Sequence, residues 1–160
     1  MSSCCGSPDL MTAATGCLCP QSGTKGCAVE LLTVKAMLRG SALSAMGAGQ
    51  YRFCADPSCG VVYFDDRGQA FTTADLRVSV WQKQPSGCRT VCYCFDENEA
   101  LMAKELAQTG RCDAVQRIRD HIAADRCACE VRNPRGTCCL GDVITVVARL
   151  PPDRGFIVET

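Results

Sequence analysis

Residues 127–143 read CACEVRNPRGTCCLGDV, and the cysteines of this stretch decide how the second half of the chain folds. The turn NPRG at residues 133–136 lies in its middle. Proline fixes φ at the second position of such a turn, and glycine accommodates the exit. The turn is therefore expected to fold Cys138 and Cys139 back toward Cys129, so that several thiols meet at one place.

A second thiol pair lies upstream, in VCYCF at residues 91–95, and two predicted helices connect it to residues 127–143. The first helix is expected to be capped by Asp96 or Asn98 and closed by Gly110. Its apolar face would comprise Met102 and Leu106.

The second predicted helix begins with a capping-box pattern formed by Asp113 and Gln116. Its apolar stripe comprises Val115, Ile118 and Ile122. The two helices are expected to run away from the first thiol pair and back toward it. This path would bring Cys92/Cys94 and Cys127/Cys129 together. Beyond them, the β-branched run VITVVARL at residues 143–150 predicts a strand that the following double proline ends.

The converging thiols predict a 2Fe-2S cluster, which needs four thiolates, two per iron. Three ligands are predicted to be Cys92, Cys94 and Cys129. The fourth is Cys138 or Cys139, because adjacent residues in an extended chain point to opposite sides and only one can ligate. Cys139 is favoured. Zinc is the competing metal, although Cys₄ zinc sites usually show C-x₂-C spacing, which this half lacks.

The first half of the chain carries a separate set of thiols that predicts a zinc site. Cys54 and Cys59 enclose ADPS, a turn between the strand-like segments QYRFC (50–54) and GVVYF (60–64). Cys19, with Cys17 or Cys27, could complete a tetrahedral thiolate site. Zinc suits a closed thiolate site that holds a small β unit together.

The fold class expected from these patterns is α+β, a small β-rich zinc-binding unit followed by a helical 2Fe-2S-binding unit. A short helix is predicted at TVKAML (33–38), capped by Thr33 and followed by Gly40, and a further strand at DLRVSVW (75–81). QKQPSG (82–87) is the predicted boundary. Four segments result: a disordered tail carrying Cys4 and Cys5 (1–16), the zinc unit (17–87), the cluster unit (88–142) and a C-terminal extension (143–160).

Composition supports metal ligation over disulfide bonding. Cysteine makes up 15 of 160 residues, an odd number, and the N-terminus has neither a basic nor an apolar segment typical of a signal peptide. The expected location is therefore the cytoplasm, where disulfides do not persist. Lys+Arg and Asp+Glu balance at 17 each, so neither nucleic acid nor an acidic membrane is an expected partner.

Some further residues are open to more than one interpretation. Cys4 and Cys5 either bind soft ions such as Cu(I) or Hg(II), or are exposed tail thiols. The only histidine, His121, is expected to be a solvated surface residue. Three arginines near the late cysteines, Arg126, Arg132 and Arg135, either raise the potential of an anionic cluster or are solvated loop charges. No Ser/His/Asp set, phosphate loop or dinucleotide motif is present, and with a single histidine conventional acid–base hydrolysis is not expected.

Taken together, CPQSGTKG, LLTVKAML, FCADPSCGVVYF, VCYCF and CACEVRNPRGTCCLGDV resemble the N-terminal domain of CopZ-type copper chaperones. That resemblance implies a zinc site, with Cys19, Cys54 and Cys59 matching its motif, and a 2Fe-2S cluster in a cytosolic protein of heavy-metal homeostasis. The cluster half is also similar to the bacterioferritin-associated ferredoxins.

Two departures from that family pattern matter. Ser22 stands where the family has the second cysteine of C-P-x-C, which leaves the fourth zinc ligand to Cys17, Cys27 or water. The further ferredoxin-like domain with an exposed C-x₂-C, found in full-length copper chaperones, is absent from these 160 residues. The expectation is that this chain handles electrons rather than copper cargo.

Two functional hypotheses follow. In the first, a non-enzymatic or weakly catalytic electron carrier reduces Cu(II) to Cu(I), with an unidentified electron donor and a separate chaperone or export ATPase as partners. In the second, the protein is a thiol-based buffer or chaperone for Cu(I) and other soft ions, without a redox role.

Overall fold

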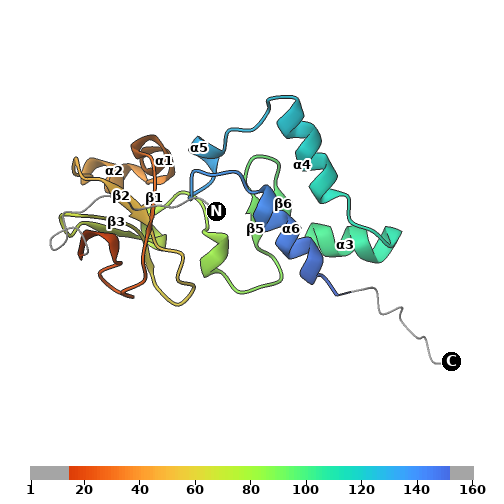
Figure 1. Ribbon diagram of the computed structural model, residues 1–160, viewed down its shortest axis with the longest axis horizontal. Coiled ribbons are helices and arrows are strands. Elements are labelled where there is room, and N and C mark those ends of the chain that lie inside the picture. The colour runs from red at the N-terminus through yellow and green to blue at the C-terminus, as the bar shows by residue number, and fades with distance from the viewer. Residues whose placement is uncertain (1–14, 152–160) are drawn as a thin grey trace, which may run out of the picture.

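The structure is a computed structural model that describes residues 15–151, and it has a mixed helix and sheet fold (Figure 1). The elements of the first half are β1 (Cys27–Ala28), α1 (Leu31–Met37), α2 (Gly40–Ser44), β2 (Tyr51–Phe53), β3 (Val61–Asp65) and β4 (Ala70–Thr72). Those of the second are β5 (Thr90–Cys92), β6 (Glu97–Asn98), α3 (Glu99–Thr109), α4 (Ala114–Ala123), α5 (Cys129–Arg132) and α6 (Leu140–Arg149). Three single-turn 3₁₀ helices lie at Thr15–Cys17, Thr73–Asp75 and Trp81–Lys83.

The first half is built on a four-stranded antiparallel sheet in the order β1-β2-β3-β4. Every residue of β3 is buried, which fits its run of β-branched and aromatic side chains. Phe53 and Tyr63 pair across β2 and β3, with ring centroids 6.2 Å apart in an edge-to-face arrangement. The strands predicted at residues 50–54 and 60–64 are thus confirmed.

Two other predictions for this half are wrong in part. Helix α1 begins after Glu30 rather than at Thr33, which is buried inside the helix, and Gly40 starts α2 instead of following a single helix. The segment 75–81 is extended only locally, since Leu76 forms a single bridge to Leu38 outside the sheet. Its alternation of apolar residues reflects burial against that short segment and not membership of a ladder.

Helix α3 matches its prediction. The Asn98 side chain accepts a hydrogen bond from the Leu101 N–H at 2.9 Å, and Gly110 ends the helix in the left-handed region at φ 77°. Helix α4 exists but has no capping box, because Gln116 bonds Asp120 instead of the start of the helix.

The strand expected at residues 143–150 is wrong, because these residues form most of helix α6. Val143 and Val146 are buried against α4 and β5, and the apolar residues from Leu140 to Leu150 recur at helical spacing. Burial of that face outweighs the strand preference of β-branched residues, whose intrinsic effect in a helix is small.

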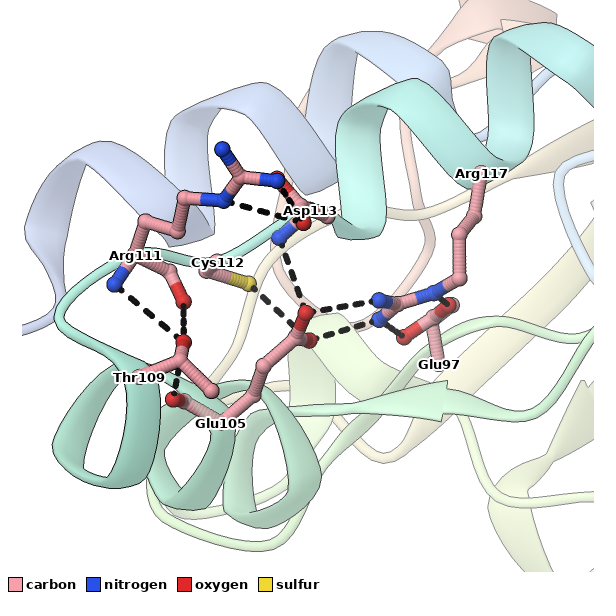
Figure 2. A network of polar contacts seen from close by, with 7 residues as sticks. All are labelled: Glu97, Glu105, Thr109, Arg111, Cys112, Asp113 and Arg117. Carbon is pink, nitrogen blue, oxygen red and sulfur yellow. Dashed lines mark hydrogen bonds and ion pairs between the residues drawn. The ribbon is translucent and has the colours of Figure 1, made fainter.

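A network of charged groups ties the second half together around Arg117 (Figure 2). Its guanidinium on α4 lies between Glu97, the first residue of β6, and Glu105 on α3. The N–O distances are 2.7 and 2.8 Å. The same Glu105 carboxylate accepts bonds from the Asp113 N–H and the Cys112 thiol. The network therefore fixes β6, α3 and α4 relative to one another.

We expect this network to make the protein acid-sensitive. Hydrogen bonding to Arg117 lowers the pKa of Glu105 to about 2, whereas an unfolded glutamate has a pKa of about 4.3. Because the pKa is lower in the folded state, the stabilisation is complete above about pH 4.3 and is lost as the pH falls toward 2. Urea midpoints measured across this range should fall more steeply for the wild type than for Glu105→Gln. Glu130→Gln, which removes an exposed carboxylate, is the control and should follow the wild type. Equal slopes for the wild type and Glu105→Gln would contradict the assignment.

The two halves meet where α1 packs on α5. There the Tyr63 hydroxyl donates a 2.6 Å hydrogen bond to the Pro134 carbonyl, in the turn that precedes Cys138. Within residues 15–151, no helix combines the length and apolar character needed to cross a bilayer. The boundary at residues 82–87 stays a prediction. Cys4 and Cys5 lie outside the described residues.

Candidate metal centres

The first candidate centre is a group of three buried thiols, Cys19, Cys54 and Cys59. Their sulfur atoms lie within 4.8 Å of one another, and they are the one group of this kind among residues 15–151. The Cys19 and Cys59 sulfurs are 3.7 Å apart. A tetrahedral ion with metal–sulfur bonds of about 2.3 Å separates its ligands by about 3.8 Å. The spacing of these sulfurs is therefore that of ligands around one metal ion.

Two tight turns bring these thiols together. In the first, the Cys19 N–H bonds the Thr24 carbonyl and the Gly23 N–H bonds the Cys19 carbonyl, both at 2.8 Å. Gly23 has φ 70°, a conformation that glycine adopts without strain. In the second turn, the Asp56 carboxylate accepts a 2.9 Å bond from the Ser58 N–H and holds Cys59 opposite Cys54.

The surroundings of this centre act differently on the Cys19 and Cys54 thiols. Burial raises the pKa of Cys19, but hydrogen bonds from Ser22 and the neighbouring backbone outweigh it and lower the pKa to about 7. Burial raises the pKa of Cys54, which has fewer donors. The Lys83 ammonium donates to the Cys59 carbonyl at 2.9 Å and places a positive charge beside the group.

Ser22, not another cysteine, completes the surroundings of the three sulfurs. Its hydroxyl lies 3.6 Å from the Cys54 sulfur. Neither Cys17 nor Cys27 belongs to the three-thiol group. Ser22 belongs to the turn 19–24, whereas Cys17 ends the 3₁₀ helix Thr15–Cys17 that precedes this turn. The sequence showed Ser22 only as a missing cysteine.

The second candidate centre consists of two thiol pairs. The Cys94 and Cys129 sulfurs are 3.7 Å apart, and the thiols of Cys92 and Cys139 are hydrogen-bonded to each other. Cys92 ends β5, Cys94 follows in the turn to β6, Cys129 begins α5 and Cys139 precedes α6. Four of the cysteines predicted as cluster ligands thus form two pairs, Cys94 with Cys129 and Cys92 with Cys139.

Hydrogen bonds to sulfur distinguish the members of these pairs. The Cys139 thiol lowers the pKa of Cys92 to about 7, and Cys92 in turn raises the pKa of Cys139. Burial raises the pKa of Cys129 to about 12. The Ala128 N–H donates to the Cys94 sulfur at 3.4 Å. These donors favour negative charge on the sulfurs they contact.

The turn at residues 133–136 forms as predicted, and the two adjacent cysteines that follow it differ in burial. The Gly136 N–H bonds the Asn133 carbonyl at 2.7 Å, and the Asn133 side chain accepts from the Arg135 N–H at 3.0 Å. Beyond the turn, Cys139 is buried and Cys138 is exposed.

The other polar residues near this centre are engaged with one another. Arg135 pairs with Asp142 at 3.3 Å, and the Arg126 guanidinium contacts the His121 ring at 3.3 Å. The expectation of a solvated His121 is wrong, because its ring is half-buried and stacks on Phe95 with centroids 3.9 Å apart. Phe95 follows Cys94 directly, so this stack joins helix α4 to the segment that carries the thiol.

Comparisons with known proteins agree with this architecture. Residues 17–77 match the model of a family, CopZ-type, that is described as a zinc binding domain. The copper chaperone CopZ of Archaeoglobus fulgidus is 32% identical over 121 residues, which cover 76% of this chain. The chain spans 57% of the length of that relative.

A solved structure is also similar. The X-ray structure of the Archaeoglobus fulgidus CopZ N-terminal domain superposes with a TM-score of 0.66 at 29% identity, covering 81% of this chain and 96% of that one. The fold is therefore that of a CopZ N-terminal domain, and it confirms the mixed helix and sheet class.

Proposed function

We propose that the protein is a metal-binding protein of copper homeostasis, related in role to a copper chaperone, with zinc held by its sheet half. The observation that carries this proposal is the three-thiol group inside a CopZ-type zinc-binding domain. The similarity to a protein named as a copper chaperone supports the copper context. It favours the chaperone hypothesis over an electron carrier. Copper or another soft ion would then be the cargo, and an export ATPase or a second chaperone the recipient.

A 2Fe-2S cluster on Cys92, Cys94, Cys129 and Cys139 is the finer part of the proposal. It is supported by the grouping of these thiols in two pairs, since such a cluster takes two thiolates on each iron. A single tetrahedral zinc ion would instead draw four sulfurs to about 3.8 Å from one another. The burial of Cys92, Cys129 and Cys139 also fits a group shielded from solvent.

The residues around the proposed cluster have separable roles. The Ala128 N–H donates to the Cys94 sulfur and reduces the charge on that ligand. Arg135 lies in the turn at residues 133–136. It is paired with Asp142, so its charge is partly offset. A bound, reduced cluster would supply a single electron, and the conversion of Cu(II) to Cu(I) requires one electron.

Metal analysis and EPR of anaerobically purified protein test this proposal. We expect one zinc, two irons and two acid-labile sulfides per chain, with a reversible one-electron signal on reduction. A colourless protein that contains zinc alone would overturn the cluster and leave the chaperone hypothesis. Absence of zinc after metal loading would overturn the assignment of the sheet half.

Deleting residues 1–16 distinguishes direct Cu(I) buffering by the N-terminal thiols from copper reduction by a cluster. The deletion removes Cys4 and Cys5 and leaves both candidate centres intact. Loss of tight Cu(I) binding with unchanged iron content would support direct buffering by these thiols. Unchanged copper behaviour would support a role for the cysteines of residues 17–160.

A further inference from the structure

Beside the Cys19, Cys54 and Cys59 group lies the hydroxyl oxygen of Ser22 and not a fourth sulfur. A tetrahedral zinc ion with a sulfur ligand at about 2.3 Å and an oxygen ligand at about 2.1 Å separates the two by about 3.6 Å. The Ser22 hydroxyl is 3.6 Å from the Cys54 sulfur. The hydroxyl is therefore at the distance from the Cys54 sulfur that is expected of a fourth ligand, oxygen or bound water.

The same side of the group opens to solvent. Ser22 and Cys59 line a surface hollow of about 220 Å³, together with Gln21, Asp56 and Ser58. The three sulfur-bearing residues are buried, whereas Ser22 is half-buried. An incoming ligand can thus approach the metal through the hollow beside the hydroxyl.

This arrangement changes which metal the group prefers. Structural zinc sites are almost always closed by four protein ligands, and open positions are typical of sites where a ligand exchanges. Soft thiolate sites select Cu(I) as well as zinc, and Cu(I) is satisfied by three thiolates without a fourth ligand. Replacing the fourth sulfur by a hydroxyl therefore weakens zinc binding and leaves Cu(I) binding largely unaffected.

We propose that Cys19, Cys54 and Cys59 form an open three-thiolate site, with Ser22 at the fourth position, that binds Cu(I) in competition with zinc. This inference rests on the proposal that these cysteines hold the zinc of the sheet half. In the exchange Zn²⁺ leaves, Cu⁺ enters, and all three sulfurs stay thiolates, so no electron is transferred. Lys83, whose ammonium donates to the Asp56 and Cys59 carbonyls, partly offsets the greater negative charge of the copper form.

The test is zinc release from the zinc-loaded full chain as Cu(I) is added stepwise as its acetonitrile complex under anaerobic conditions. Ser22→Cys supplies a fourth sulfur and should slow zinc release by more than about tenfold, the lower limit for loss of even an outer-shell partner. Ser44→Cys adds the same thiol on the exposed surface of α2 and should behave as the wild type.

A second measurement reports the ligands directly. Zinc X-ray absorption should show three sulfurs and one oxygen in the wild type, and four sulfurs in Ser22→Cys. Four sulfurs in the wild type, or equal zinc release from the wild type and Ser22→Cys, would overturn the open site. If the wild type binds no zinc, or if Cys54→Ala leaves its zinc affinity unchanged, the proposed zinc ligands themselves are wrong.

Discussion

Replacing Cys139 by alanine is expected to abolish iron binding at the second centre. Cys139 is buried, and its thiol is hydrogen-bonded to that of Cys92, so the change removes one member of a thiol pair. Losing an outer-shell partner already costs about 10–100-fold in metal affinity, and losing a ligand should cost more. Iron and sulfide content and the visible absorption of anaerobic protein measure the effect.

The neighbouring residue supplies the control for this change. Cys138 is exposed, so Cys138→Ala should keep the full iron content and the EPR signal of the wild type. Zinc content serves as the check that Cys139→Ala still folds, because the three-thiol group lies in the other half of the molecule. Iron loss in Cys138→Ala with retention in Cys139→Ala would reverse the assignment.

Gly136→Ala is expected to destabilise the fold by about 2–5 kcal/mol. Gly136 has φ 68°, where a side chain costs about 1–2 kcal/mol. A Cβ atom there would also lie 2.6 Å from the Thr33 hydroxyl oxygen on α1, and such overpacking typically costs about 1–3 kcal/mol. Because this contact joins the two halves, the urea midpoint followed by circular dichroism should fall clearly.

Gly110→Ala isolates the backbone part of that cost. Gly110 also has a positive φ, 77°, but a Cβ atom there meets nothing within 4 Å. We therefore expect a loss of only about 1–2 kcal/mol. If both substitutions cost the same, the expected clash of the new Cβ atom with Thr33 is absent and this prediction is wrong.

Much of the fold follows from local sequence signals. Strands β2 and β3 form where β-branched and aromatic residues cluster, and α3 runs from its Asn98 cap to Gly110 as predicted. The turn at residues 133–136 also forms as its Asn, Pro and Gly residues require. These elements could be predicted because each depends on contacts among neighbours in the chain.

The elements that sequence reasoning missed depend on distant partners. The β-branched residues of α6 favour a strand locally, but α4 and β5 bury one face of them as a helix. The segment 75–81 has the alternation of a strand, yet its partner is the short stretch around Leu38. In both cases tertiary burial outweighs a local preference of a few tenths of a kcal/mol.

That the thiols form two sets could be read from the chain, because their number, spacing and intervening turns are local properties. Which thiols face one another depends on the tertiary structure. It buries Cys139 against Cys92 and leaves Cys138 exposed, and it places the Ser22 hydroxyl beside Cys54 instead of the Cys17 thiol. Metal ligands must meet within a few ångströms, and such distances between residues far apart in the chain are set by packing, not by sequence spacing.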